Sequence, residues 1–258
     1  MLNIIKIGGK VIDDPEARQA FLNDFAAASG PKILIHGGGK IATRIATRLG
    51  VKSTLVEGRR ITTPEMMSVV TMVYGGLVSK EIVAALQGLG CNALGLSGAD
   101  GNLIEATRRP VGRIDYGLAG DISSVNRDFL ELLLSHQLTP VVAPLSHNKA
   151  GQLLNTNADT IAAEVAISLA GRGPLSLIYC FEMPGVLRNA QDPKSVIPTL
   201  NVSEYQALKS TGDIFEGMIP KLDNAFRVAR TGVMVRIGSA AQLPQLLTGQ
   251  AGTVLSCE

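Results

Sequence analysis

The sequence has no tryptophan, only three cysteines and a small share of aromatic residues. The cysteines, Cys91, Cys180 and Cys257, are far apart and form no C-x-x-C motif. This spacing argues against a disulfide framework and a zinc site, so we expect buried small apolar side chains. The formal net charge is only +2, and the 24 Lys and Arg residues are spread along the chain. Because a nucleic-acid-binding protein concentrates its basic residues, nucleic acid is not an expected partner.

Long apolar runs and a signal-like N-terminal segment are also lacking, so we expect a cytoplasmic protein that does not enter a membrane. The 258 residues, 46% of them hydrophobic, are enough to bury a large core as one domain or as two closely packed lobes. The 28 glycines indicate many tight connections between helices and strands. These properties favour the α/β class.

Short apolar runs alternate with longer segments of helical period, which predicts a mainly parallel sheet covered by helices. A capping box of Thr62 and Glu65 predicts the start of a long helix, and the mixed segment 101–123 predicts a hairpin that rims a site. A lobe boundary is expected at 171–174. The expected strands are 3–7, 32–36, 92–97, 140–143, 175–181 and 233–237, and a further helix is expected at about 158–170.

The segment ILIHGGGKIA, residues 33–42, combines a strand pattern, three glycines and the start of a helix. The amides of Gly37, Gly38 and Gly39 would point the same way as the helix dipole, which suits a bound anion. A tight turn for close packing of helix and sheet is the alternative. The run also satisfies G-x-G-x-x-A, and Glu57, twenty residues after Gly37, could hold a ribose in a Rossmann protein.

An earlier strand already ends in a glycine turn, IIKIGGK at 4–10, and two neighbouring turns suggest one shared anion site. Lys6 lies in this strand, where a buried ammonium is costly unless it is paired or binds an anion; an edge-strand lysine facing water is the alternative. Lys221, in EGMIPKLDNAF at 216–226, would by default be a solvated helix lysine. Asp159, in LLNTNADTIAAEVA at 153–166, could orient both lysines, while Asn157 is a candidate N-cap.

Two glycine turns, two lysines and one aspartate suit phosphoryl transfer, in which catalysis is mostly positioning and neutralisation of charge. The chain has no GxxxxGK[ST] loop and no HRD or DFG set, which excludes the P-loop and protein kinase families. Its histidines, His36, His136 and His147, show no metal-ligand spacing, and we expect His36 to anchor the glycine loop.

In this order and over essentially the whole chain, IIKIGGK, ILIHGGGK, EGRRIT, LLNTNAD and GMIPK resemble the acetylglutamate kinases of the amino acid kinase family. The resemblance implies a three-layer αβα sandwich with an open, mainly parallel central sheet. An N-terminal lobe, 1–172, would bind the acylglutamate and mediate dimerisation, and a C-terminal lobe, 173–258, would bind ATP. The implied reaction phosphorylates the side-chain carboxylate of N-acetyl-L-glutamate to give N-acetyl-L-glutamyl 5-phosphate, the second step of arginine biosynthesis.

The resemblance also implies residue roles. Lys6 and Lys221 would stabilise the transition state, and Asp159 would align them. Arg60 would clamp the α-carboxylate, because a guanidinium binds a carboxylate in bidentate fashion. The other implied substrate-binding residues are Gly38, Gly39 and Asn155, and the implied phosphoryl contacts are Gly8, Gly9, Gly38 and Gly39. The implied ATP-binding residues are Glu182, Met183, Pro184, Gly185, Val186, Leu187, Asp213, Ile214, Phe215 and Met218.

On the nucleotide side, Glu182 stands where the family usually has an aspartate before a Pro-Gly turn. ATP is expected to carry Mg²⁺ on its phosphates, because no carboxylate cluster in the sequence resembles a metal cage. Arginine-inhibited hexameric members have an extra N-terminal helix, whereas Lys6 lies almost at the start of this chain, so we expect a homodimer insensitive to arginine.

Three alternatives stay open on the sequence alone. Arg59, beside Arg60, could meet the distal carboxylate of N-succinyl-L-glutamate as the acceptor, or it could be a solvated loop arginine. A Rossmann-type NAD-binding protein is a more distant possibility, as is a nucleotide-binding module without catalytic activity. The joint presence of Lys6, Asp159 and Lys221 argues against the last, because a module that only binds does not need the full set.

Overall fold

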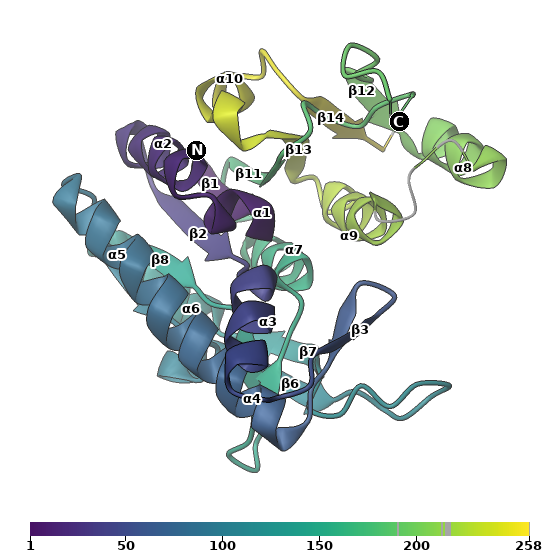
Figure 1. Ribbon diagram of the computed structural model, residues 1–258. Helices are drawn as coiled ribbons and strands as arrows, with labels where there is room; N and C mark the ends of the chain where they lie inside the picture. The colour runs from purple at the N-terminus through teal and green to yellow at the C-terminus, as the bar shows by residue number, and fades with distance from the viewer. Residues whose placement is uncertain (190, 213, 215–217, 258) are drawn as a thin grey trace.

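The computed structural model describes residues 1–189, 191–212, 214 and 218–257, and its centre is an eight-stranded sheet (Figure 1). The strand order is β12-β14-β13-β11-β1-β2-β8-β5, and among the described pairs of this sheet β13–β14 alone is antiparallel. These strands are β1 (Leu2–Ile7), β2 (Lys32–His36), β5 (Ala93–Leu96), β8 (Thr139–Val142), β11 (Leu175–Phe181), β12 (Thr199–Asn201), β13 (Met234–Ser239) and β14 (Thr253–Ser256).

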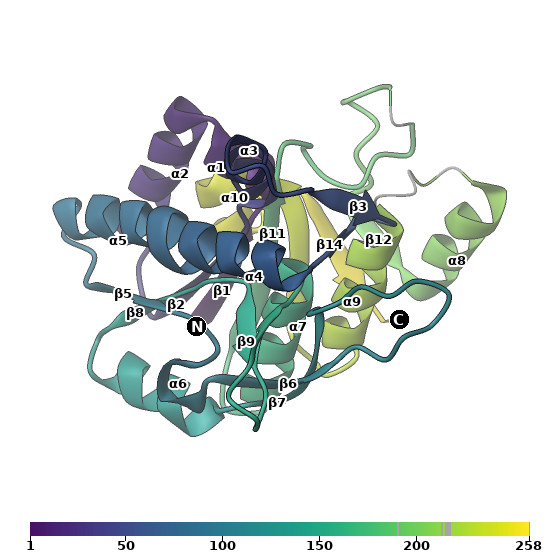
Figure 2. The same ribbon diagram turned by 60° about the horizontal axis from the view of Figure 1, so that its bottom comes forward.

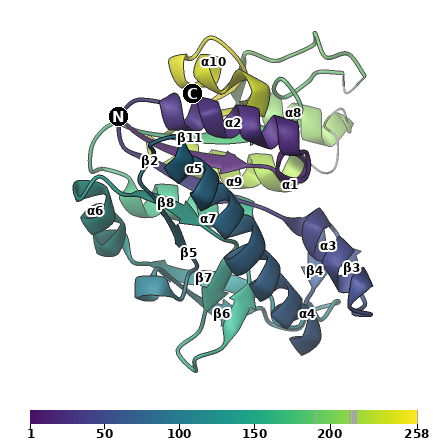
Figure 3. The same cartoon turned by 60° about the vertical axis from the view of Figure 1, so that its left-hand side comes forward.

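Helices lie on both faces of this sheet, which confirms the predicted αβα sandwich (Figures 1 and 3). The helices are α1 (Gly9–Asp13), α2 (Pro15–Ala27), α3 (Gly39–Arg48), α4 (Pro64–Val70), the π-helical η1 (Thr71–Val78), α5 (Ser79–Gly88), α6 (Arg127–Ser135), α7 (Ala158–Leu169), α8 (Val202–Thr211), α9 (Ile219–Ala229) and α10 (Leu243–Thr248), with short 3-10 turns η2 (Asp100–Asn102) and η4 (Ala240–Gln242).

Side chains alternate between the two faces along the central strands, and each face has its own hydrophobic core. In β1, Ile4 packs in the core that includes α6, α7 and α9, whereas Ile5 packs in the core that includes α2, α4, α5 and α10. Because β1 pairs with β11 on one side and β2 on the other, Lys6 lies in a central strand. The edge-strand interpretation of Lys6 is therefore wrong.

The long helix predicted near residue 64 is present as α4, η1 and α5 in direct succession (Figure 3). Its N-cap is Thr63, whose hydroxyl accepts a hydrogen bond from the Met66 amide at 3.2 Å, so the predicted capping residue Thr62 is wrong by one position. Thr62 is buried and forms a bridge with Gly117, and its hydroxyl donates to the Arg60 carbonyl oxygen at 3.1 Å. These backbone and hydroxyl contacts leave it unable to cap the helix.

By length and composition alone, the continuous helix Pro64–Gly88 is long and apolar enough to cross a membrane, because an 18-residue stretch of it has a mean hydropathy of 1.5. This corrects the expectation that no apolar run is that long. Val70, Val78, Ile82 and Leu86 on this helix are buried in the core beneath it. A buried core helix passes the same length and composition test, so the observation does not indicate a membrane span.

The segment after η2 forms the predicted hairpin, in which β6 (Ile104–Arg108) pairs antiparallel with β7 (Gly120–Val125) (Figure 2). Together with β9 (Leu145–His147) and β10 (Leu153–Asn155) it builds a second, four-stranded sheet. A separate two-stranded hairpin consists of β3 (Thr54–Val56) and β4 (Arg59–Ile61). All six predicted central strands are present within two residues at each end, whereas β12 and β14 were not predicted.

The expectation for the cysteines is confirmed for two of the three. Cys91 and Cys180 are buried free cysteines as predicted, but Cys257 is exposed. The predicted boundary at 171–174 lies between α7 and β11, yet the central sheet continues across it, because β11 pairs with β1 along its length.

Candidate active site

Two lysines from opposite ends of the chain meet at one carboxylate. Lys6 extends from β1 and Lys221 from the first turn of α9, while Asp159 lies in the first turn of α7. Lys6 Nζ is 2.6 Å from Asp159 Oδ1, and Lys221 Nζ is 2.6 Å from Oδ2. The structure thus brings together the three residues that the sequence singled out.

Local structure explains why they meet. Lys6 points to the same sheet face as Ile4, which is the face that α7 covers. Asn157 caps α7 by accepting hydrogen bonds from the Asp159 and Thr160 amides, which places Asp159 directly at the helix start. On the neighbouring strand β11, Tyr179 lies opposite Lys6, and its hydroxyl donates to the Asp159 carbonyl oxygen at 3.1 Å. Sequence analysis did not identify Tyr179, because its role depends on strand register.

The electrostatics of this cluster follow from burial and from charge pairing. Burial raises the pKa of the Asp159 carboxyl, but the Lys6 and Lys221 ammonium groups outweigh that effect and hold the pKa well below its usual range. Burial lowers the pKa of the Lys6 ammonium, and the attraction of Asp159 only partly offsets this. With two ammonium groups and one carboxylate, the cluster keeps one unit of positive charge for an anionic ligand.

The two glycine turns lie against each other beside this cluster. The Gly8 amide donates to the Cys180 carbonyl oxygen at 2.9 Å, which fixes the first turn to β11. A Cβ placed on Gly9 would lie 3.8 Å from both the Gly38 and the Gly39 nitrogen, and one on Gly37 would lie 3.4 Å from the Gly9 nitrogen. Gly8 and Gly38 are the N-caps of α1 and α3. Amides and positive helix ends from two turns therefore converge, as a shared anion site requires.

A cavity of about 180 Å³ opens next to the second glycine turn. It is lined by Gly37, Gly38, Gly39, Leu55, Gly58, Arg59, Arg60, Tyr74, Arg109, Ala119, Gly120, Pro144, Asn155, Thr156, Asn157 and Ala158. The predicted substrate residues Gly38, Gly39, Arg60 and Asn155 are all among them. The β3–β4 hairpin supplies Arg59 and Arg60, so it forms one wall of the cavity.

Arg60 is held firmly at this wall. It is 7% exposed, its Nη1 donates to the Ser53 hydroxyl, and its Nη2 donates to the Gly39 carbonyl oxygen at 2.7 Å and to Thr43 Oγ1 at 3.0 Å. Arg59, on the same strand, is exposed and also lines the cavity. A guanidinium has five N–H donors, so Arg60 keeps donors for a carboxylate while its orientation is fixed.

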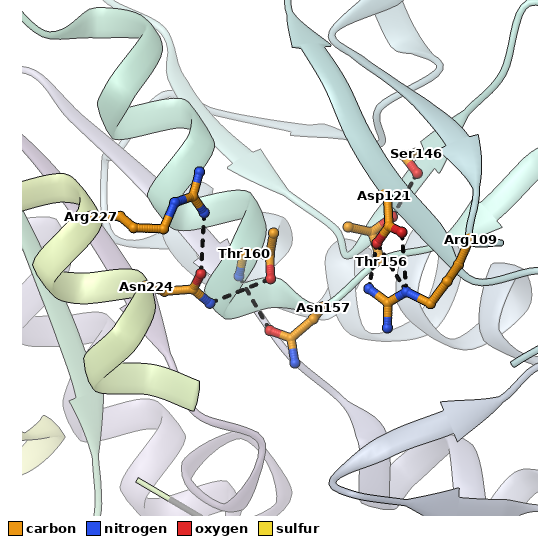
Figure 4. A network of polar contacts seen from close by, with 8 residues as sticks. All are labelled: Arg109, Asp121, Ser146, Thr156, Asn157, Thr160, Asn224 and Arg227. Carbon is orange, nitrogen blue, oxygen red and sulfur yellow. Dashed lines mark hydrogen bonds and ion pairs between the residues drawn. The ribbon is translucent and has the colours of Figure 1, made fainter. Parts of the chain in front are cut away.

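A second ion pair at the cavity was missed by sequence reasoning. Arg109 lies directly after β6 and binds Asp121 of β7 through Nε, 3.0 Å from Oδ1, and through Nη2 (Figure 4). Nearby, the Thr156 and Ser146 hydroxyls are 2.6 Å apart, and Asn155 Nδ2 donates to the Thr62 hydroxyl at 2.9 Å. Pairing across a hairpin depends on its register, which the sequence alone does not specify.

A polar chain also links α7 to α9 (Figure 4). Arg227 Nη1 donates to Asn224 Oδ1 at 3.4 Å, and Asn224 Nδ2 donates to the Thr160 hydroxyl at 3.5 Å. Arg227 Nη2 further binds Glu164 of α7 at 2.8 Å. These contacts join the two helices that carry Asp159 and Lys221.

The predicted nucleotide residues follow β11 and precede α9. Val186 is buried in the core, and its amide donates to the Thr253 hydroxyl at 2.9 Å. Glu182 is exposed, with Lys10 Nζ 3.9 Å from its Oε1. Ile214 is buried, and Met218 packs partly against the same core. Asp213 and Phe215 lie outside the described residues.

The Rossmann alternative receives no support from this geometry. Glu57 lies in the turn of the β3–β4 hairpin rather than at the end of a central strand, so it does not occupy the ribose-binding position of a Rossmann fold. Within the described ranges, no group of three or more His, Cys, Asp and Glu side chains could hold a metal ion.

Comparisons with known proteins identify the family. The chain matches the model of the amino acid kinase family over residues 1–239. It is 53% identical over 248 residues to an acetylglutamate kinase of Cytophaga hutchinsonii, covering 95% of this chain and 94% of the relative. It is 50% identical to an acetylglutamate kinase of Parabacteroides distasonis, with 95% and 96% coverage. The chain therefore belongs to the amino acid kinase family.

Solved structures share the fold. An N-acetylglutamate synthase of Neisseria gonorrhoeae, complexed with coenzyme A and N-acetyl-glutamate, superimposes with a TM-score of 0.82 at 23% identity, covering 100% of this chain and 59% of that one. A carbamate kinase of Giardia lamblia bound to AMP-PNP superimposes with a TM-score of 0.74 at 16% identity, covering 100% and 98%. At these identities the likeness concerns the fold alone.

Proposed function

We propose that the protein transfers the γ-phosphoryl group of ATP to the side-chain carboxylate of N-acetyl-L-glutamate, giving N-acetyl-L-glutamyl 5-phosphate and ADP, in the second step of arginine biosynthesis. A carboxylate oxygen forms a bond to the γ-phosphorus as the bond from that phosphorus to the β,γ-bridging oxygen breaks. The observation that carries the proposal is the convergence of Lys6 and Lys221 on Asp159 beside two glycine turns. The names of the curated relatives support the acetyl acceptor.

The residues act mainly by positioning and charge neutralisation. Each lysine ammonium donates one N–H to Asp159, which leaves two N–H groups to donate to phosphoryl oxygens. In our proposal Lys6 and Lys221 stabilise charge on the moving group and on the leaving ADP, and Asp159 aligns both. The amides of Gly8, Gly9, Gly38 and Gly39 contact the phosphoryl group or the acceptor. No covalent intermediate is required, because the acceptor carboxylate is itself the nucleophile.

The same proposal places the two substrates in different lobes. Arg60 and Asn155 bind the amino-acid part in the cavity of the N-terminal lobe, 1–172, which also mediates dimerisation. ATP lies along the C-terminal lobe, 173–258, against residues 182–187, Ile214 and Met218, with Mg²⁺ carried on its phosphates. We also propose that the protein is a homodimer and acts in the cytoplasm.

A hydroxamate assay tests the reaction directly, because hydroxylamine traps an acyl phosphate. The purified protein is incubated with ATP, Mg²⁺ and either N-acetyl-L-glutamate or N-succinyl-L-glutamate, and ADP release is followed in parallel. We expect hydroxamate and ADP in equal amounts with the acetyl substrate. ADP release without hydroxamate, or no turnover with either acylglutamate, would refute the proposal.

A further inference from the structure

His36 is a buried polar side chain at the end of β2, directly before the three glycines. It is 0% exposed, and burial lowers the pKa of its imidazole to about 4, so the ring is neutral under ordinary conditions. Its Nδ1 lies 2.8 Å from the carbonyl oxygen of Gly37, the next residue. Because a carbonyl oxygen only accepts, Nδ1 must carry the ring proton and donate it.

The other ring nitrogen has no such task. Nε2 of His36 is buried, and it has no hydrogen-bond partner within the described part of the chain. A buried imidazole that leaves one nitrogen unsatisfied is costly, since the unpaired group loses its hydrogen bonds to water. The single contact at Nδ1 is therefore the polar interaction through which His36 acts on its surroundings.

That contact fixes a peptide plane. In a trans peptide the carbonyl oxygen of Gly37 and the N–H of Gly38 point in opposite directions, so holding the oxygen determines where the amide points. The Gly38 nitrogen lies on the side of the first glycine turn, 3.8 Å from the position of a Cβ on Gly9. Gly38 has φ +150°, a conformation that glycine adopts far more easily than other residues, so the backbone here needs an external restraint.

We propose that His36 is a positioning residue for phosphoryl transfer, which holds the Gly37 carbonyl oxygen so that the Gly38 amide points at the transferred phosphoryl group. The inference rests on the proposed function, because the aimed amide matters only if an anion is stabilised there. Since Gly37 and Gly38 also line the cavity, the Gly38 amide lies between the cavity proposed for the acylglutamate and the anion site that the two glycine turns share. If the Gly38 amide pointed elsewhere, it would no longer stabilise the transition state, whereas the arginines would still bind the substrate in the ground state.

Two carboxamide variants separate this role from simple packing. The carboxamide nitrogen of His36→Asn takes the place of Nδ1, whereas that of His36→Gln takes the place of Nε2. Both remove the ring, so both lose packing. We expect His36→Asn to keep kcat within about threefold of the wild type, and His36→Gln to lower kcat by about 10- to 100-fold with nearly unchanged KM for ATP and acceptor. Melting temperatures of both variants monitor folding.

Equal kcat values for the two variants, or a loss confined to KM, would overturn the inference. Nitrogen-15 NMR of the imidazole in the wild-type protein tests it without any variant. We expect the Nδ1-protonated tautomer, and the Nε2-protonated tautomer would contradict the proposal even if His36→Gln failed to fold. A wild-type protein that forms no acyl phosphate would refute the proposed function instead, so the two failures are distinguishable.

Discussion

At the residue scale, Asp159 balances two ammonium groups in a site that is largely closed to water. Its own exposed fraction is 8%, and that of Lys6 is 6%. Removing one member of such a cluster leaves a buried charge without its partner, which is more costly than the pair was worth. The cluster therefore has both a structural and a chemical requirement, and variants must distinguish between them.

Replacing Lys6 with alanine is expected to lower kcat by about 100- to 1,000-fold and to change KM much less, because the charge acts chiefly in the transition state. Steady-state kinetics with the hydroxamate assay measure both constants. Lys149→Ala is a matched control, since the side chain of this lysine is 84% exposed and it lies between β9 and β10. A kcat of Lys6→Ala close to that of Lys149→Ala would contradict the assigned role.

The stability of the protein is expected to depend on His36 between about pH 4 and 6.5. The pKa of the folded imidazole is about 4, against an ordinary value of 6.5, so in this window the unfolded chain binds a proton that the folded chain does not. Stability therefore falls as the pH is lowered from about 6.5 to about 4, by a total of about 3 kcal/mol from this group.

Denaturant unfolding of wild type and His36→Asn across this range tests the point. The variant has no titrating group at position 36, so the difference in unfolding free energy between the two proteins should shrink as the pH falls. Asp159 does not confuse the result, because its lowered pKa means that its contribution is lost only below about pH 3.9. A pH-independent difference would show that His36 is not held neutral.

Arg59 is the candidate contact for a second acceptor, N-succinyl-L-glutamate. It lines the cavity beside the fixed Arg60 and is itself exposed, so it could approach a distal carboxylate or remain in water. We expect Arg59→Ala to leave kcat/KM for N-acetyl-L-glutamate within about threefold, since exposed ion pairs contribute little. Any selective loss should appear with N-succinyl-L-glutamate. If Arg59→Ala changed kcat/KM equally for both substrates, Arg59 would have no part in acceptor specificity.

At the element scale, the second glycine turn depends on the backbone conformation of Gly38. A Cβ there would lie 3.2 Å from the Tyr74 ring, and the residue that carries it would have to adopt φ +150°. We expect Gly38→Ala to lose both stability and at least about 100-fold in kcat, because the turn that presents its amides would be distorted. Activity assays and thermal melting on the same samples measure the two effects.

Gly232→Ala is the matched control for this turn. Gly232 also has a positive φ, +82°, but nothing lies within 4 Å of its added Cβ, and it connects α9 to β13 away from the cavity. We expect it to lower stability by about 1 kcal/mol and to leave kcat unchanged. If Gly38→Ala affected only stability, as Gly232→Ala should, the turn would have no catalytic part.

The same elements explain how far the sequence leads. The central strands were predictable because a parallel sheet covered on both faces needs uninterrupted apolar runs such as that of β11. The short strands β12 and β14 carry too few residues for such a signal. The π-helical geometry of η1 also escaped prediction, since apolar spacing predicts a helix but not how its hydrogen bonds are made.

For the site, the sequence sufficed wherever chemistry forces an unusual choice. A lysine within an apolar strand and three glycines before a helix are both costly, so they indicated Lys6 and Gly38. Arg109–Asp121 and Tyr179–Asp159 carry no such signal. They arise from the register of β6 against β7 and of β1 against β11, which is settled only when the whole sheet has assembled.

At the scale of the whole molecule, we expect a homodimer whose activity is insensitive to arginine. Met72 and Leu77 on the long helix are 54% and 44% exposed, which leaves apolar surface available for a partner chain. Light scattering coupled to gel filtration should give twice the 27.1 kDa of one chain, both with and without arginine. A hexamer, a monomer or inhibition by arginine would contradict this prediction.

The pairing of β1 with β11 also has a consequence for biosynthesis. One of the two strands that neighbour residues 2–7, Leu175–Phe181, is made about 170 residues after them. Until then one edge of β1 stays open to other chains, and Lys221, the second partner of Asp159, is made later still. The nascent N-terminal half therefore cannot complete its sheet until β1 pairs with β11. We expect slow folding and a need for chaperones as a result.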